Sequence, residues 1–271
     1  MQKDAGKVAE RWRKEAEFFD HEEYSEGPIP PITVQRYLDL KKPWLPVEYP
    51  FSLLANVAGK RILEIGCGDG CNAIILGLKG ARVHGIDISA RAIQIASERA
   101  VLHGIADRVQ FTCTPLEMYV ESSPQESFDI ICGWAVLHHV LPILDSVLVD
   151  LKKLAHQDTT FLFSEPLSTW KWLRKLRLML PIPVQGTPDE RPLDADDLAI
   201  IRHHLPKARL RYFGAAGRIV RRVLPVNYEM SSHFTRFCYD WAARCDNVLF
   251  RVPGARGLAS SVTLFGGTRA D

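Results

Sequence analysis

Residues 61–70 read Arg-Ile-Leu-Glu-Ile-Gly-Cys-Gly-Asp-Gly, and this stretch decides the fold of the chain. Its first half is a short apolar run of the kind that forms a strand covered on both faces of a parallel sheet. Its second half has glycine at every other position, which allows a sharp turn into the helical pattern that begins near Cys71. Because the start of a helix offers unpaired N–H groups, Gly66, Gly68 and Gly70 predict a ligand-binding turn.

The alternation of short β-branched runs with longer helical patterns continues from Lys60 to Phe163. This rhythm is typical of a doubly wound, Rossmann-like α/β fold, in which helices cover both faces of a mostly parallel sheet. One helix is clearly marked, since Ser89 is a good N-cap and Gly104 a good helix end. We expect strands at residues 61–65, 82–86, 108–111, 128–133 and 159–164, and two later strands at 208–213 and 260–266.

The pattern differs on either side of this core. Residues 1–58 are interpreted as an N-terminal helical lid, residues 59–213 with 259–271 as the core, and residues 214–258 as a helical cap. Within the later part of the core we expect a basic amphipathic helix at 170–180 and a helix capped by Asp194 at 194–205.

The composition is that of an ordinary globular protein, since 46% of the 271 residues are hydrophobic and 24% are charged. The 34 Lys and Arg nearly balance the 32 Asp and Glu, so no basic excess is available to hold nucleic acid. No apolar run reaches the roughly 18–20 residues needed to cross a bilayer. The first 26 residues mix acids and bases without the apolar region of a signal peptide, which predicts a cytoplasmic protein.

The six cysteines lie scattered in apolar segments, which predicts reduced thiols rather than disulfides. Cys67 and Cys71 have a separation seen in metal sites, but no further ligands with a matching spacing accompany them. The cysteine pattern therefore predicts no metal site.

Acidic residues near the glycine turn indicate which ligand it would hold. Asp87 ends the second strand about twenty residues further on, where a carboxylate can accept hydrogen bonds from both ribose hydroxyls. Glu64 precedes the first glycine and Asp69 lies inside the turn, and both would oppose the pyrophosphate of a dinucleotide. The glycine spacing GxGxG also differs from the dinucleotide fingerprint GxGxxG. These residues favour a positively charged nucleoside.

At these positions the chain resembles the class I S-adenosylmethionine-dependent methyltransferases, in their small-molecule branch. The resemblance covers about residues 59–166, through the glycine turn, Asp87, and the run Phe-Asp-Ile-Ile at 128–131 that leads into Val-Leu-His-His at 136–139. It implies an enzyme with S-adenosylmethionine as cofactor and a seventh, antiparallel strand, for which 260–266 is the candidate. In the family the glycines hold the methionine part, the first acid its ammonium group, and the second acid the ribose. Cofactor contacts are accordingly expected at Glu64, Gly66, Cys67, Gly68, Gly70, Asp87, Ile88, Leu116 and Trp134.

One stretch departs from the family pattern. Where many relatives carry Gly-Asp-Ala after the third strand, this chain reads Thr114-Pro115-Leu116, so the usual partner of the adenine amine is missing. We expect the adenine to rest on apolar side chains, with the Leu116 N–H as donor and Glu117 as a candidate acceptor. Trp134 either covers the cofactor or packs under the following helix.

His138 and His139 follow the fourth strand, at the edge of the sheet where ligands bind in such folds. Either imidazole suits the general base that a hydroxyl or acidic carbon acceptor needs, with His138 slightly preferred. The alternative is that the pair only caps or packs locally. Glu165, at the end of the fifth strand, either contacts the acceptor or stabilises the loop.

The acceptor pocket is expected to be apolar, because the lid carries Tyr24 and the later region carries many aromatics. Candidate lining residues in that later region are Tyr212, Phe213, Tyr228, Phe234, Phe237, Tyr239 and Trp241.

The sequence therefore predicts O-methylation, in preference to C-methylation, of a small hydrophobic or aromatic metabolite. A nucleic-acid methyltransferase is disfavoured, because the Asn/Asp-Pro-Pro-Tyr motif is absent after the fourth strand. A noncatalytic nucleoside-binding module is the remaining alternative. The basic helix at 170–180 is interpreted as a solvated face rather than a membrane-surface contact, and the oligomeric state is not predicted.

Overall fold

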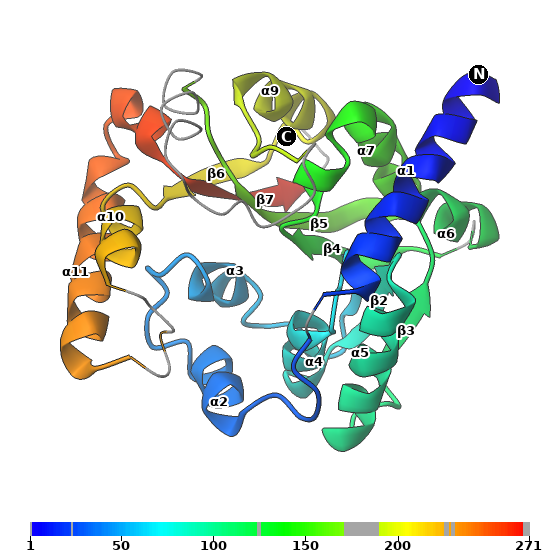
Figure 1. Cartoon of the computed structure of the whole chain (residues 1–271), viewed down its shortest axis with the longest axis horizontal. Coiled ribbons are helices and arrows are strands. Elements are labelled where there is room, and N and C mark those ends of the chain that lie inside the picture. The colour runs from blue at the N-terminus through cyan, green and yellow to red at the C-terminus, as the bar shows by residue number, and fades with distance from the viewer. Residues whose placement is uncertain are drawn as a thin grey trace.

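The computed structural model describes residues 2–22, 24–123, 126–170, 190–224, 228 and 231–267. Seven strands form one sheet in the order β3-β2-β1-β4-β5-β7-β6 (Figure 1). Neighbours are parallel except β7, which runs antiparallel to both β5 and β6. The predicted Rossmann-like sheet with an antiparallel last strand is therefore confirmed. The strands are β1 (Arg61–Ile65), β2 (Arg82–Asp87), β3 (Val109–Cys113), β4 (Phe128–Trp134), β5 (Ala155–Pro166), β6 (Arg209–Phe213) and β7 (Ser261–Gly267).

Helices cover both faces of the sheet (Figure 1). The side chains of α3, α4 and α5 share one buried cluster with Ile62 and Val83, and those of α6, α7 and α9 share another with Leu63 and Phe161. Burial between two helical layers explains why the central strands β1 and β4 and the second half of β5 consist mainly of apolar residues. The helices are α1 (Gln2–Asp20), α2 (Pro31–Asp39), α3 (Glu48–Leu53), α4 (Cys71–Leu78), α5 (Ala90–Leu102), α6 (Leu116–Ser122), α7 (Leu144–Lys153), α9 (Ala195–His204), α10 (Ala216–Val223) and α11 (His233–Leu249), with short 3₁₀ turns η1 (Leu137–His139), η2 (Leu141–Ile143) and η3 (Pro253–Leu258).

Local signals in the sequence account for the ends of two helices. The Ser89 hydroxyl accepts a hydrogen bond from the N–H of Ala92 and begins α5, and Gly104 follows the helix with a φ of +67°. Asp194 and Asp197 form a reciprocal capping box at the start of α9. The basic helix expected at 170–180 falls, beyond Trp170, outside the described residues.

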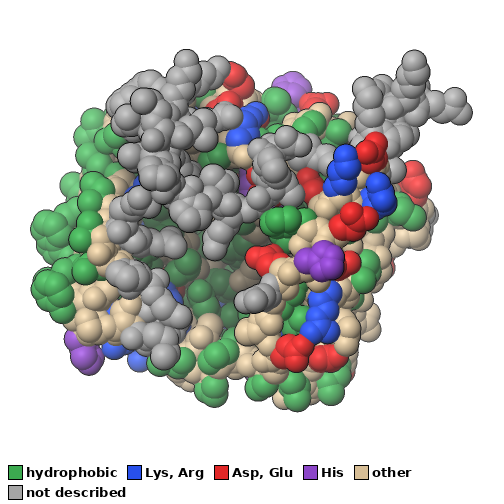
Figure 2. All heavy atoms as spheres, in the orientation of Figure 1, with side chains coloured by type: hydrophobic (Ala, Val, Ile, Leu, Met, Phe, Trp, Pro, Cys, Tyr) green, Lys and Arg blue, Asp and Glu red, His purple; other side chains and the backbone are tan. Residues whose placement is uncertain are grey.

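The predicted cap region contains α10 and α11, which pack against each other. Three aromatic side chains of α11, Phe234, Phe237 and Trp241, are 69%, 66% and 63% exposed. They lie on the outer edge of the molecule, where Figure 2 shows hydrophobic atoms over α11 at the left. Their i, i+3, i+7 spacing places them on one helix face, and that face points away from the sheet.

Within the described part of the chain, the structure contains no helix that is both long and apolar enough to span a membrane.

Candidate active site

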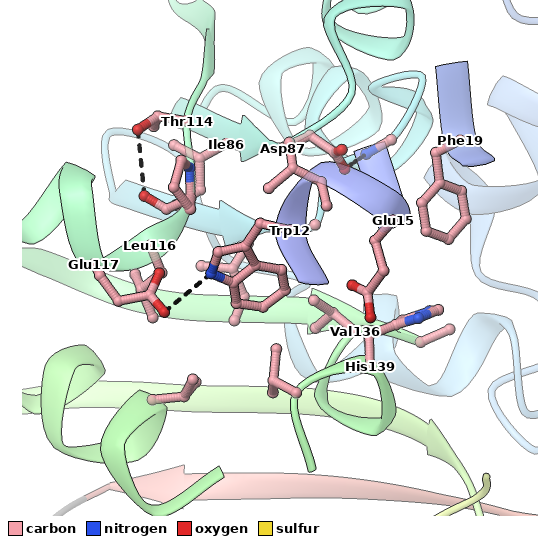
Figure 3. A pocket seen from close by; sticks show the side chains of 18 of the residues that line it. Trp12, Glu15, Phe19, Ile86, Asp87, Thr114, Leu116, Glu117, Val136 and His139 are labelled. Carbon is pink, nitrogen blue, oxygen red and sulfur yellow. Dashed lines mark hydrogen bonds between the residues drawn. The ribbon is translucent and has the colours of Figure 1, made fainter. Parts of the chain in front are cut away.

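A cavity of about 430 Å³ lies at the carboxyl ends of β1, β2 and β4 (Figure 3). The glycine turn and the ends of the strands form its floor, α1 forms one wall, and the segment after β4 forms another. Most of the lining surface is apolar, with a few carboxylates and one imidazole. This location and character are those of a ligand pocket in a doubly wound sheet.

The glycine turn has the backbone that its sequence requires. Gly66, Gly68 and Gly70 have φ angles of +61°, +50° and +77°, a region that side-chain-bearing residues rarely adopt. A Cβ on Gly66 would lie 2.5 Å from Val136, and one on Gly70 would lie 2.7 Å from Ala96. A Cβ on Gly68 would meet nothing within 4 Å, because this residue faces the open cavity. The turn therefore brings bare backbone to the ligand space at Gly68.

Asp87 lies at the end of β2 and lines the cavity beside Ile88. Its Oδ2 accepts a hydrogen bond from the N–H of Gly68 at 2.8 Å, and its Oδ1 accepts one from the N–H of Ser89 at 2.9 Å. Burial raises the pKa of this carboxyl group, and the backbone donors oppose that rise. Each carboxylate oxygen has a second lone pair, so both can still accept a ligand hydroxyl.

Glu64 is fully buried beneath the glycine turn and does not itself line the cavity. Its Oε1 accepts a hydrogen bond from the side chain of Asn72 at 3.2 Å, whereas its Oε2 has no hydrogen-bond partner. Burial raises the pKa of Glu64 to about 8. An unpartnered buried carboxyl oxygen is costly, and a positively charged group in the cavity would stabilise its ionised form.

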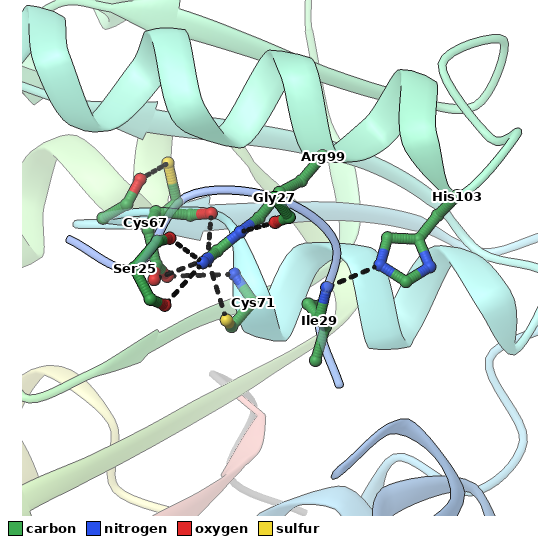
Figure 4. Close-up of polar contacts among 9 residues, drawn as sticks. Ser25, Gly27, Ile29, Cys67, Cys71, Arg99 and His103 are labelled. Carbon is green, nitrogen blue, oxygen red and sulfur yellow. Dashed lines mark hydrogen bonds and ion pairs between the residues drawn. The ribbon is translucent and has the colours of Figure 1, made fainter. Parts of the chain in front are cut away.

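The Asp69 side chain is paired within the protein instead of facing a ligand alone. The buried Arg99 of α5 forms an ion pair with Asp69 over 2.5 Å and donates to the carbonyls of Gly27 at 3.0 Å and Ser25 at 2.5 Å (Figure 4). The N-terminal segment is thereby fastened to the glycine turn. The expectation that Asp69 would repel a phosphate is weakened by this neutralising partner.

The far end of the cavity is formed by Thr114, Pro115 and the start of α6. Leu116 lines it with an apolar side chain, as expected. Glu117 also lines it, and its Oε1 accepts a hydrogen bond from the indole N–H of Trp12 at 3.3 Å (Figure 3). The Oε2 of Glu117 is buried without a hydrogen-bond partner, so this oxygen is available to a ligand amine.

Glu165 organises the segment that follows β4. Ala135 has a left-handed φ of +52°, which turns the chain out of the strand. The carboxylate of Glu165 then accepts hydrogen bonds at 2.9 Å from the N–H groups of Val136 and Leu137, and at 3.0 Å from His138 Nδ1. This is the loop-stabilising role rather than direct contact with the cavity, which Glu165 does not line.

His139, rather than His138, lies on the cavity wall. Its ring packs edge-on against Phe19, its Nδ1 lies 3.1 Å from Glu190 Oε1, and the Glu15 side chain points toward it from α1 (Figure 3). Burial and the charge of His138 lower the pKa of His139, which favours the neutral imidazole. The cavity therefore has one polar corner, made by His139 and the buried carboxyl of Glu15.

Three other candidate residues are placed differently from their predicted roles. Trp134 stacks on Phe51 with ring centroids 5.4 Å apart and does not line the cavity, so it packs in the core. Phe213 is buried on β6 beside Tyr49, away from the cavity. Tyr24 does line the cavity, where burial and the nearby Asp87 raise the pKa of its hydroxyl. Tyr24 therefore lies at the ribose end predicted for the cofactor.

Cys67 and Gly70 were expected to contact the cofactor, but neither of these two residues lines the cavity. The Sγ of Cys67 instead packs against Gly85, where an added Cβ would approach it to 2.9 Å. None of the seven aromatics expected to line the acceptor pocket, from Tyr212 to Trp241, borders the cavity in the described part of the chain.

Sequence reasoning missed Trp12, Glu15 and Glu190. Trp12 and Glu15 lie on α1, three residues apart, so they share the helix face that lines the cavity. Glu190 is distant from His139 in the sequence, and only the fold brings the two side chains together.

The donor and acceptor set fits a positively charged nucleoside such as S-adenosylmethionine. Two buried carboxyl oxygens, on Glu64 and Glu117, have no hydrogen-bond partner. Asp87 presents two oxygens, and Gly68 leaves room for close approach. Among the residues that the structure describes, no Lys or Arg lines the cavity to compensate the charge of a pyrophosphate.

Known proteins of similar sequence support this interpretation. The chain is 32% identical over 111 residues to a ubiquinone biosynthesis O-methyltransferase from Neisseria meningitidis, a match covering 41% of this chain and 45% of that relative. The chain thus matches less than half the length of the first such relatives.

Solved structures share the fold. A geranyl diphosphate C-methyltransferase from Streptomyces coelicolor A3(2) has a TM-score of 0.59 at 11% identity, covering 96% of this chain and 98% of that one. A magnesium protoporphyrin IX methyltransferase from Synechocystis PCC 6803 has a TM-score of 0.52 at 17% identity, covering 97% and 95%. A model of the methyltransferase domain matches residues 46–193, more than half of the chain. The chain therefore belongs to the methyltransferase domain family.

Proposed function

We propose that this protein is an S-adenosylmethionine-dependent methyltransferase that methylates an oxygen atom of a small, apolar acceptor. The observation that carries the proposal is the set of acceptors at the glycine turn. Asp87 accepts from the N–H of Gly68, whose bare backbone faces the cavity, and the buried Glu64 has an oxygen without a hydrogen-bond partner. These groups suit a nucleoside that carries positive charge and no phosphate.

The residues of the turn would hold the cofactor from three sides. Asp87 would accept the ribose hydroxyls beside Ile88, and Tyr24 covers the same end. Gly66 and Gly68 would border the methionine part, and the buried carboxylate of Glu64, which does not line the cavity, would stabilise the ammonium group through its charge. Leu116 and Glu117 would receive the adenine at the far end, where Trp12 closes the wall.

The polar corner would activate the acceptor. S-adenosylmethionine, when bound, supplies a methyl group on a positively charged sulfur, so that a C–O bond forms as the C–S bond breaks and a neutral thioether is left. The acceptor hydroxyl must also lose its proton, and His139 and Glu15 are the proton acceptors that line this corner. His138 would act through the loop, since Glu165 holds its ring. Exclusion of water by the α1 wall favours this transfer.

The chemical class of the acceptor is inferred from the lining of the cavity and from the proteins of similar sequence. The lining beyond the polar corner is mainly apolar, with Val136, Val140 and Phe19 near His139. Relatives named as O-methyltransferases of ubiquinone biosynthesis favour oxygen over carbon as the accepting atom. A small hydrophobic or aromatic hydroxyl compound is therefore the acceptor we expect.

The test combines binding with turnover. Calorimetry with S-adenosylhomocysteine should show binding, and labelled-methyl transfer should appear with phenols and catechols but not with single-stranded DNA or RNA. His139→Ala and Glu15→Gln should each reduce turnover about 100-fold while leaving S-adenosylhomocysteine affinity nearly unchanged. His203→Ala, an exposed histidine outside the site, is the matched control. Binding without transfer to any acceptor would identify a noncatalytic module, and transfer to nucleic acid alone would overturn the proposed acceptor class.

A further inference from the structure

Two histidines and a glutamate meet beside the polar corner of the cavity. One side-chain ligand atom from each of His138, His139 and Glu190 lies within 4.8 Å of the other two. We propose that these three residues bind a divalent transition-metal ion. The cysteine pattern gave no sign of such a site, because none of these ligands is a cysteine.

The fold holds the three residues together from two distant segments. His138 and His139 form the 3₁₀ turn η1 directly after β4. Glu190 belongs to the segment before α9, which is joined to the end of β5 by the bridge between Leu167 and Leu193. Next to Glu190, the guanidinium of Arg191 donates to both carboxylate oxygens of Asp197, at 2.5 and 3.0 Å. The cluster is therefore fixed by backbone pairing and a bidentate ion pair, as a preformed site requires.

Glu165 orients the first of the two imidazoles. Because its carboxylate accepts from His138 Nδ1 at 3.0 Å, the proton of the neutral ring lies on Nδ1 and the lone pair on Nε2. Metal-binding histidines usually donate their second ring N–H to a carboxylate or carbonyl, which fixes the tautomer and the ring orientation. His138 has this arrangement, with the Glu165 side chain fully buried.

The charge balance favours a cation. The side chains of Glu165 and Glu190 are 0% and 6% exposed, and those of His138 and His139 are 12% and 17% exposed. Glu15, 4% exposed, brings a third carboxyl to the same corner. Burying carboxyl groups is unfavourable unless they are hydrogen-bonded, as Glu165 is, or paired with positive charge. A divalent ion supplies that charge at the point where the imidazoles also converge.

The ligand set indicates the class of metal. Imidazole nitrogens suit Zn²⁺ and Fe²⁺, whereas Mg²⁺ and Ca²⁺ prefer oxygen ligands alone. Three protein ligands leave coordination positions open, as in catalytic sites. Because His139 lines the cavity, a ligand in the cavity could occupy one of these positions.

A catalytic role for the bound ion rests on the proposed function. With the ion bound, the lone pair of His139 would be held by the metal. The acceptor hydroxyl would bind the ion and become more acidic, and its proton would pass to Glu15 alone, which lines the cavity without being one of the three ligands.

Metal binding is tested directly, on protein without a histidine tag. After treatment with a chelator and removal of it, equilibrium dialysis should show stoichiometric binding of Zn²⁺, and Co²⁺ should give the visible absorption of a low-symmetry site. His139→Ala and Glu190→Gln should weaken Zn²⁺ binding more than about 100-fold, and the positioning variant Glu165→Gln about 10- to 100-fold. His203→Ala should bind as the wild type does. Unchanged S-adenosylhomocysteine affinity in each variant shows that the fold is intact.

The outcomes separate this inference from the proposed function. Zn²⁺ binding that is equal in the wild type and the His139→Ala, Glu190→Gln double variant would overturn the metal site. Full methyl transfer by the chelator-treated enzyme would overturn the role of the ion while the proposed function stands. Zn²⁺ binding that depends on His139 and Glu190, without transfer to any acceptor, would uphold the site and overturn the proposed function.

Discussion

The backbone N–H of Gly68 donates a hydrogen bond to Asp87 Oδ2 over 2.8 Å, so the glycine turn after β1 and the end of β2 form one unit. The ligand surface at this point is therefore built by two neighbouring parallel strands, and disturbance of either strand reaches the other.

Asp87→Asn should weaken binding of S-adenosylhomocysteine by about 2 kcal/mol, or roughly 30-fold. The amide keeps the shape of the carboxylate, but it loses the charge and puts an NH₂ group where Gly68 and Ser89 donate. Isothermal titration calorimetry measures the change. The exposed Asp107→Asn is the control, and equal affinity of both variants and the wild type would refute the ribose role of Asp87.

Glu64 should make the stability of the ligand-free protein fall as the pH rises. Its pKa of about 8 lies above its ordinary value of 4.5, so between these values the native state holds a proton that the unfolded state has lost. Stability from this group is thus fully present below pH 4.5 and is lost as the pH rises through about 8. Urea unfolding at several pH values should show this slope in the wild type and lack it in Glu64→Gln. A slope that persists unchanged in the variant would assign it to other groups.

Binding of a ligand that carries an ammonium group should release a proton from Glu64. At pH 7 the buried carboxyl group is mostly protonated, since its pKa is about 8, and a nearby ammonium group would lower that pKa. The apparent binding enthalpy of S-adenosylhomocysteine should therefore depend on the ionisation enthalpy of the buffer. In Glu64→Gln this dependence should disappear. A wild-type enthalpy that is the same in phosphate and in Tris would contradict the proton release.

Arg99→Leu should destabilise the protein by about 3–5 kcal/mol, because it removes one partner of a buried ion pair and leaves carbonyls of Ser25 and Gly27 without their donor. Cofactor binding should weaken as well, since Arg99 ties the N-terminal segment to the turn. Chemical denaturation gives the first value and calorimetry the second. Arg108→Leu, which removes an exposed pair with Asp107, should change stability by less than about 0.5 kcal/mol.

Trp12→Ala should speed the release of S-adenosylhomocysteine. The indole forms part of the cavity wall and is anchored to Glu117, so its loss removes apolar cover worth about 1.5–3 kcal/mol. Stopped-flow measurements should show a dissociation rate raised at least about 10-fold with little change in association. Lys14→Ala, on the exposed side of α1, is the control. An unchanged dissociation rate would mean that α1 does not act as a lid.

Much of this architecture could be predicted from local sequence. Each strand was predicted within a few residues of its observed bounds. The buried central strands were the clearest, because they consist mainly of apolar residues. The positive φ angles of Gly66, Gly68 and Gly70 were implied by residue type. Asp87 was found by its distance from the turn.

The contacts between distant segments could not be predicted in this way. Nothing in the local sequence pairs Arg99 with Asp69, thirty residues earlier, so the charge of Asp69 was expected to be uncompensated. Likewise, the spacing of Phe234, Phe237 and Trp241 defines one helix face, but periodicity does not say whether that face turns inward. They lie on the outer surface, and the expectation that they line a pocket was wrong for the described part of the cavity.

β7 is paired on both sides, with β5 and with β6. A ribosome delivers the chain from its N-terminus, so β6 emerges before the strand that joins it to the sheet has been synthesised. The nascent chain can assemble β1 to β5 during translation, but it then carries an open sheet edge beside β5 until residue 267 has left the exit tunnel. Chaperone engagement during synthesis is therefore expected at that edge, and stalling the ribosome before β7 should leave a product prone to aggregation.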